Sequence, residues 1–220
     1  MGWAEFIAAF AAFFLSHSVP LRPNIKAWIV ARAGAGGFTL GYSILSLAVL
    51  AWVIGAAGRA PFVPLWGWAA WQGYVTLGVM LGVCVILGLS IGRPNPFSFG
   101  GAQNARFDPG RPGIVRLTRH PLLLALALWA VAHILPNGDL AHVILFGSFA
   151  GFALGGMWIV DRRKRRGMGA EWLRLDHARR QAGIAPRSWG MACVRGLLGG
   201  LLYVGLLAAH PSLFGVSPLG

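Results

Sequence analysis

Histidine is the residue of this sequence with the clearest capacity for chemistry, because imidazole binds transition metals and exchanges protons near neutral pH. The chain has six histidines. Five of them lie at the ends of apolar stretches: His17, His120, His133, His142 and His210. No HxxH or HExxH spacing is present in the sequence, so spacing along the chain alone defines no metal site.

A second feature is the motif Thr118-Arg119-His120-Pro121. Proline is favoured in the first turn of a helix, so the motif predicts that an apolar helix begins here. Arg119 would then lie beside the free backbone amides of that helix end, a position suited to an anion. The alternative is an arginine that extends to the membrane surface, next to a simple capping turn.

The composition indicates an integral membrane protein. Apolar residues make up 56 % of the 220 residues and charged residues 11 %, whereas soluble domains average roughly 45–50 % and about 25 %. The net charge of +13 by itself favours a nucleic-acid binder, but the uninterrupted stretches are apolar, so no nucleic-acid partner is expected. Cys84 and Cys193 form no CxxC motif and predict no disulfide framework.

Stretches of about 20 apolar residues predict membrane-spanning helices. The expected fold class is therefore all-α: a polytopic integral membrane helix bundle with about six transmembrane helices. Glycine pairs four residues apart, such as Gly88/Gly92 and Gly196/Gly200, predict close packing between these helices. The six stretches are Trp3–Ser18, Phe38–Ala57, Trp68–Ile91, Thr118–Leu135, Leu140–Val160 and Ala192–Ala209.

The basic residues are distributed asymmetrically between the loops. Of the 19 Lys and Arg side chains, all but Arg59 fall in or beside three alternate loops, at about residues 19–37, 92–117 and 161–191. The positive-inside rule makes these loops cytoplasmic and places both termini outside. The same excess of positive charge predicts contact with anionic lipid head groups at the cytoplasmic face.

This topology separates the histidines by depth. His17 and His120 lie at the inner side, and the other three histidines named above lie at the outer side, near the turn Asn137–Asp139. Two interpretations of the outer group stay open. The histidines are interfacial side chains beside a turn, or they form a metal site.

One cytoplasmic segment, residues 168–183, is expected to form an amphipathic helix on the membrane surface. Glu171 and Arg174, and likewise Asp176 and Arg180, are spaced for ion pairs on such a helix. The alternative is a solvated helical hairpin. In the first interpretation the following side chains contact lipid: Trp172, Leu173 and Leu175.

The sequence resembles the NnrU family over most of its length. The resemblance rests on FLSHSVPLRP (Phe14–Pro23), GIVRLTRHPLLLALALWAVAH (Gly113–His133), NGD (Asn137–Asp139) and DRR (Asp161–Arg163). It implies one family domain over residues 1–220, as a multi-pass protein of the bacterial cytoplasmic (inner) membrane. It also implies a role in denitrification, in producing functional nitrite and nitric oxide reductases, with these enzymes or their maturation factors as partners.

The NnrU family is related to the plant 15-cis-zeta-carotene isomerase, which carries haem b. The resemblance therefore implies haem b here, with His17 and His133 matching the two haem histidines. The isomerase has a cysteine three residues before the second histidine, where this chain has Ala130. His120 is the rival ligand because it shares the predicted depth of His17, whereas thirteen residues, about 20 Å of helix, separate it from His133. Arg119 would contact a haem propionate or another anion.

Two other classes of function stay open. One is a membrane enzyme acting on a lipophilic substrate, either an isomerase or a methyltransferase similar to the isoprenylcysteine methyltransferases, which share the Arg-His-Pro motif. In those methyltransferases an aromatic residue and a glycine follow the motif, whereas Leu122-Leu123-Leu124 follows it here. The other class is a non-catalytic membrane partner subunit.

Overall fold

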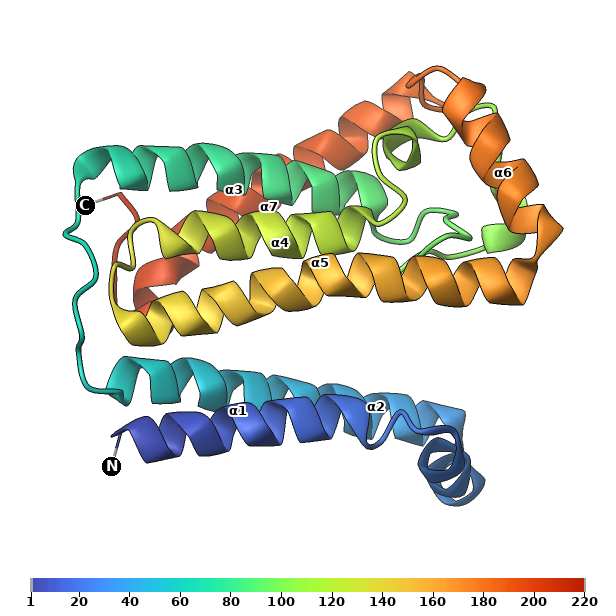
Figure 1. Cartoon of the computed structure of the whole chain (residues 1–220). Helices are drawn as coiled ribbons and strands as arrows, with labels where there is room; N and C mark the ends of the chain where they lie inside the picture. Colours follow the sequence, from blue (N-terminus) through green and yellow to red (C-terminus); the bar gives the residue numbers. More distant parts are fainter. Residues whose placement is uncertain (1, 220) are drawn as a thin grey trace. The chain divides into compact units, whose positions relative to one another are not determined.

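A computed structural model describes residues 2–219 of the chain, and the elements in this range are helical (Figure 1). The expected all-α class is confirmed. Within residues 2–219 there are seven α-helices and two short 3-10 helices: α1 (Gly2–Ser18), α2 (Pro23–Arg59), α3 (Ala70–Ser90), η1 (Asn104–Arg106), η2 (Gly113–Arg116), α4 (Pro121–Ile134), α5 (Leu140–Met168), α6 (Ala170–Gln181) and α7 (Trp189–Phe214).

Each of the six stretches predicted to span a membrane lies on one of these helices. Four helices in the described part of the chain, α2, α3, α5 and α7, are long and apolar enough to cross a bilayer. The other two are shorter, with 17 residues in α1 and 14 in α4. A 14-residue helix rises about 21 Å, less than the ~30 Å of a hydrocarbon core. The helices are those of a membrane protein, and the count of six spans stays a prediction.

The segment 19–37 is mostly helical rather than a loop. α2 begins at Pro23, where proline suits a first helical turn, and it is interrupted at Gly34 with φ 72° and ψ 167°. Residues with a side chain rarely adopt this positive φ, so the position favours glycine although a Cβ atom would have no other atom within 4 Å. The basic residues of the segment therefore lie mainly on a separate helical piece that precedes the apolar part of α2.

The described residues form two compact units. Unit 1 contains residues 2–67 and 138–145, and unit 2 contains residues 68–137 and 146–219. In unit 1, α1 packs along α2, with Phe6, Ala9 and Phe13 forming the buried face of α1. The backbone of Leu65 donates to the carbonyl of Gly138 at 2.7 Å. At Gly138 a side chain would collide with Trp66, which explains the glycine in the predicted turn.

In unit 2, α3 packs against both α4 and α7 (Figure 1). The contact between α3 and α7 is closest at Gly88 and Gly199, where a Cβ atom on either glycine would collide with the backbone of the other helix. α4 packs against α5 through Leu123, Ala127 and Ala153. α3 and α7 therefore pack closely at glycine as expected, but the predicted pairs are confirmed only at Gly88. A Cβ atom on Gly92, Gly196 or Gly200 would have no other atom within 4 Å, and Gly199 is the glycine of α7 at the contact.

α6 lies across the end of unit 2 at which α3 ends and α4 begins (Figure 1). Trp172 and Leu175 are only 6 % and 8 % exposed, because they pack against Phe97 and Val115 of the segment that joins α3 to α4. The expectation that Trp172 and Leu175 contact lipid is therefore wrong, since this loop covers them. Leu173 is exposed.

Both predicted ion pairs of α6 are confirmed. Arg174 lies 2.7 Å from Glu171, and Arg180 lies 2.8 Å from Asp176. The helix is therefore amphipathic as expected, although its apolar face is covered by protein.

Candidate functional site

Two places in unit 2 contain most of the residues that the sequence singled out, whereas His17 and His142 lie in unit 1. The first lies where α4, α5 and α6 meet, and we call it the α6-end cluster: Arg119, His120, Asp161, Asp176 and Arg179. The second lies at the other end of α4, and we call it the histidine pocket: the cavity lined by His133 and His210.

In the α6-end cluster, the segment just before α4 places Arg119 and His120 side by side. The hydroxyl of Thr118 accepts from the backbone N–H of His120 at 3.1 Å, and the side-chain amide of Asn95 donates to the carbonyl of Arg119 at 2.9 Å. These bonds fix the backbone in front of Pro121, where α4 begins. The predicted helix start is therefore confirmed.

The side chain of Arg119 is fully engaged by carboxylates of the chain. Its Nε lies 3.0 Å from Oδ1 of Asp161 on α5, and its Nη1 lies 3.3 Å from Oδ1 of Asp176 on α6. The hydrogen bonds to Asp161 raise the pKa of Arg119 above its usual value. The position predicted to suit an anion is therefore filled by two carboxylates from neighbouring helices.

The ring of His120 is engaged at both nitrogens. Nδ1 lies 3.0 Å from the hydroxyl of Ser98, and Nε2 lies 2.9 Å from Oδ1 of Asp161. The residue is only 3 % exposed, and this burial lowers the pKa of His120 even though Asp161 favours its protonation. Coordination of a metal by His120 would require one of these two hydrogen bonds to break.

Asp176 holds the cluster together from α6. Burial raises the pKa of Asp176, but hydrogen bonds from Arg179 and Arg180 outweigh that effect and keep the pKa below its usual value. Arg179 also donates to the carbonyls of Val115 and Arg116 at 3.0 and 2.9 Å. The cluster thus fastens α6 to the ends of α4 and α5 and to η2, which is a positioning role.

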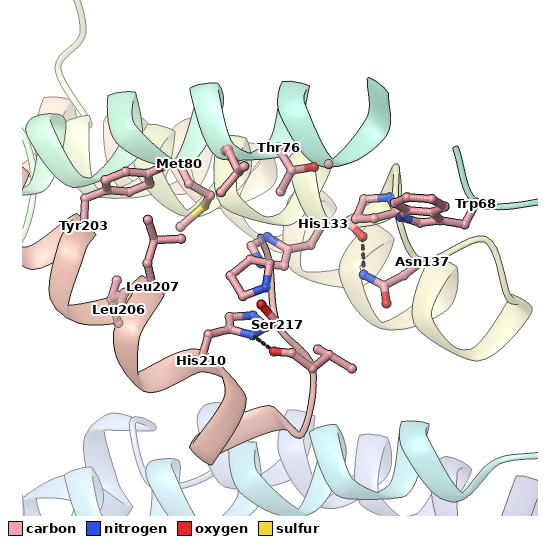
Figure 2. Close-up of a pocket in the computed structure, with 15 residues that line it drawn as sticks. Trp68, Thr76, Met80, His133, Asn137, Tyr203, Leu206, Leu207, His210 and Ser217 are labelled. Carbon is pink, nitrogen blue, oxygen red and sulfur yellow. Dashed lines mark hydrogen bonds between the residues drawn. The ribbon is translucent and has the colours of Figure 1, made fainter. Parts of the chain in front are cut away.

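The histidine pocket lies between α3, α4, α7 and the segment that follows α7 (Figure 2). Its volume is about 350 Å³, within the range of small-molecule sites. Most of the lining is apolar, and a few polar groups project into it. The principal wall residues besides the two histidines are Trp68, Thr76, Leu77, Met80, Tyr203 and Leu207.

The two histidines of the pocket are held in the same way. Nδ1 of His133 lies 2.8 Å from the carbonyl of Trp129, and Nδ1 of His210 lies 2.8 Å from the carbonyl of Val216. Because a carbonyl only accepts, Nδ1 carries the proton and Nε2 of each neutral ring keeps a lone pair. Among the described residues, neither Nε2 atom has a hydrogen-bond partner. Histidines that bind metals typically donate their second nitrogen to a carbonyl in this manner.

His17 has a similar arrangement in unit 1. Its Nδ1 lies 2.8 Å from the carbonyl of Phe13, and its ring packs on the Phe13 ring with centroids 4.2 Å apart. The axial pair of His17 and His133 stays a prediction, because the two residues belong to different units. His142, also in unit 1, is paired with Asp139 at 2.7 Å.

The donor set of the pocket fits a haem better than a metal bound by protein ligands alone. Residues 2–219 contain no group of three or more His, Cys, Asp or Glu side chains arranged to hold a metal ion. Two imidazoles suffice for a haem iron, since the porphyrin supplies the other four ligands and histidine is a common axial ligand. His133 and His210 supply such lone pairs within an apolar cavity.

The sequence missed several partners in these two places. The sequence groups His210 with His133 only by depth, and it does not pair Asp161 or Asp176 with Arg119. The scarcity of acidic residues is a signal that points to these ion pairs, because the chain has only six acidic side chains. A carboxylate in a strongly basic region is therefore a candidate ion-pair partner.

Comparison with known families supports the resemblance noted in the sequence. A family model described as NnrU protein matches residues 5–218. No curated protein and no solved structure matches the chain. Since the match covers nearly the whole sequence, the chain belongs to the NnrU family.

Proposed function

We propose that this NnrU-family protein binds haem b in the bacterial inner membrane and supports the production of functional nitrite and nitric oxide reductases. The observation that carries the haem proposal is the pair of pocket histidines, each with Nδ1 bonded to a backbone carbonyl and Nε2 without a hydrogen-bond partner among the described residues. The role in denitrification rests on the family resemblance.

The residues of the pocket would bind and orient the group. His133 is held by the carbonyl of Trp129 and lies against the Trp129 ring at a centroid distance of 5.2 Å. The side-chain amide of Asn137 donates to the carbonyl of His133 at 2.7 Å and so fixes the end of α4 (Figure 2). The cavity walls around the two imidazoles are mostly apolar. When bound, haem b supplies one-electron chemistry at its iron.

His133 would be one of the two histidines that hold the haem, and the second would be His17 or His210. His17 is the partner implied by the resemblance to the isomerase. His210 is the partner that shares the cavity with His133.

The test is the visible spectrum of the detergent-purified protein, oxidised and dithionite-reduced, from cells supplied with iron and haem precursor. We expect a Soret band that weakens strongly in His133→Ala and is unchanged in His177→Ala, which removes an exposed histidine of α6. Loss of the low-spin spectrum in His17→Ala or in His210→Ala identifies the second ligand. A folded protein that is colourless would overturn the haem proposal.

The apolar cavity also supports a second candidate, an enzyme acting on a lipophilic substrate. Tyr203 and Trp68 line the cavity, and rigid aromatic walls suit a flat or polyene substrate. Co-purified lipid extracted from the haem-free protein and identified by mass spectrometry would favour this candidate. Intact denitrification in a strain with Ala at positions 17, 120 and 133 would instead favour a non-catalytic partner subunit.

A further inference from the structure

A groove on α5 has a surplus of positive charge that the chain does not neutralise. Its volume is about 490 Å³, and it is lined by Trp158, Ile159, Arg162, Arg163 and Arg166. These positions recur at intervals of three and four residues along one face of the helix. The groove is therefore a surface that a single ligand can contact from end to end.

The carboxylates of the chain are committed elsewhere. There are six acidic side chains, and each has another partner. The pairs are Glu5 with Arg59, Asp108 with the backbone of Gly110, Asp139 with His142, Asp161 with Arg119 and His120, Glu171 with Arg174, and Asp176 with Arg119, Arg179 and Arg180. No acidic side chain of the described residues pairs with the three groove arginines. Within residues 2–219, these three guanidinium groups therefore lack a carboxylate partner and are accessible to an anionic ligand.

The other half of the groove is apolar and exposed. Trp158 and Ile159 are 63 % and 59 % exposed, and the guanidinium of Arg162 lies over the Trp158 ring at 5.4 Å from its centroid. A ligand that satisfies both halves needs an anionic end and an apolar body. A small inorganic anion would leave the apolar half uncovered.

The position of the groove along α5 matches the depth of a lipid head group. The helix is apolar from Leu140 to Val160, which is about 30 Å of helix and equals the thickness of a hydrocarbon core. Arg162 and Arg166 therefore lie just beyond the hydrocarbon, where phosphates are found, and Trp158 lies at the boundary that indole favours.

We propose that this groove is a binding site for one anionic diacyl phospholipid, with its phosphate between Arg162 and Arg166 and an acyl chain along Trp158 and Ile159. The site does not depend on haem binding. The neighbouring Arg165 does not line the groove, because its guanidinium lies over the Trp172 ring of α6 at 5.5 Å from the centroid.

The test is native mass spectrometry of the full chain, released from detergent after incubation with phosphatidylglycerol or with phosphatidylcholine of the same acyl chains. We expect wild type to retain phosphatidylglycerol preferentially. Arg162→Ala/Arg166→Ala should reduce that retention by about tenfold or more, since each basic residue near an anionic surface contributes substantially to binding. The control Arg165→Ala/Arg174→Ala removes the same charge outside the groove and should retain the lipid.

Three outcomes would overturn the proposal. The first is equal retention of the two lipids by wild type, and the second is equal loss in the groove variant and in the control. The third is displacement of the lipid by inorganic phosphate at equal concentration, which would assign the site to a free anion.

A separate variant tests the apolar half of the groove. Trp158→Ala should weaken the retention of phosphatidylglycerol although all three arginines remain. Full retention would contradict the proposed contact between the acyl chain and Trp158.

Discussion

The two ends of unit 2 use histidine in opposite ways. At the α6 end, both ring nitrogens of His120 are bonded to side chains of the protein, Ser98 and Asp161. At the pocket end, His133 and His210 each donate only through Nδ1, and to a backbone carbonyl. His120 connects three segments of the fold, whereas the pocket histidines keep a lone pair for a ligand.

In unit 2, the number of hydrogen bonds at the ring nitrogens distinguishes a structural histidine from a candidate ligand better than the surrounding sequence motif does. His120 belongs to the conspicuous motif Thr118–Pro121 and is nevertheless occupied by the protein itself. His210 belongs to no motif and shares a cavity with His133. If this division holds, removing a side chain from the α6-end cluster should destabilise the protein more than removing a pocket histidine.

The largest effect is expected for Asp176→Ala. The side chains of Asp176 and Arg179 are 8 % and 6 % exposed, so the variant leaves a buried guanidinium without its carboxylate. We expect a loss of about 3–5 kcal/mol in the free energy of unfolding, measured by denaturant titration in detergent. Glu171→Ala breaks a pair exposed to solvent, so it should change the free energy of unfolding far less than Asp176→Ala does. Equal losses in the two variants would contradict a structural role for the α6-end cluster.

A smaller effect is expected from acid. Burial keeps the pKa of His120 below its usual value of 6.5, so the unfolded chain binds this proton more readily than the folded protein. The stability due to neutral His120 is complete above pH 6.5. It decreases as the pH falls, by at most ~1.4 kcal/mol per pH unit, until the folded pKa is passed.

His120→Asn should remove this contribution, so the decline of the unfolding midpoint between about pH 7 and pH 5 should be shallower than in wild type. The matched control is His177→Asn, because His177 is exposed on α6. An identical decline in wild type and His120→Asn would exclude His120 as its source.

His210→Ala should alter the pocket with little loss of stability. The variant removes one hydrogen bond, to the carbonyl of Val216, which contributes about 0.5–1.5 kcal/mol. If His210 is an axial ligand, the haem should change from low spin to high spin in electron paramagnetic resonance, and added imidazole should restore the low-spin signal. A loss of stability as large as that of Asp176→Ala would mean that His210, like the α6-end cluster, mainly stabilises the fold.

The smallest effect is expected for Trp172→Phe. The indole N–H of Trp172 is buried without a hydrogen-bond partner among the described residues, so its removal relieves an unsatisfied donor while the ring contact with Phe97 is largely kept. We expect a change of less than about 1 kcal/mol, measured by the same denaturant titration. A loss of several kcal/mol would show that the indole nitrogen has a role that the contacts do not reveal.

Local features of the fold were predictable from the sequence, whereas contacts between distant segments were not. The helix start at Pro121 and the pairs Glu171–Arg174 and Asp176–Arg180 follow from spacings within one or two helical turns. The bonds from Arg119 to Asp161 and Asp176 join residues 42 and 57 positions apart. Such contacts depend on how helices pack, which no periodicity encodes.

In the histidine pocket, too, local features were predictable from the sequence and contacts between distant segments were not. The sequence placed His133 and His210 at one depth, because charge asymmetry and span lengths set depth. It could not show that the two face one cavity, since this depends on α4 and α7 packing against the same helix, α3. The burial of Trp172 was missed for a similar reason, because the covering residue Phe97 lies in an irregular segment.

The backbone contact between Gly88 and Gly199 has a consequence for the dimensions of the cavity. Leu77 on α3 and His210 on α7 each lie eleven residues from that contact, which is about 17 Å along either helix. With the contact point fixed, a change of about 10° in the crossing angle would move these two walls apart by about 3 Å. A residue change far from the cavity can therefore decide which ligands fit between them.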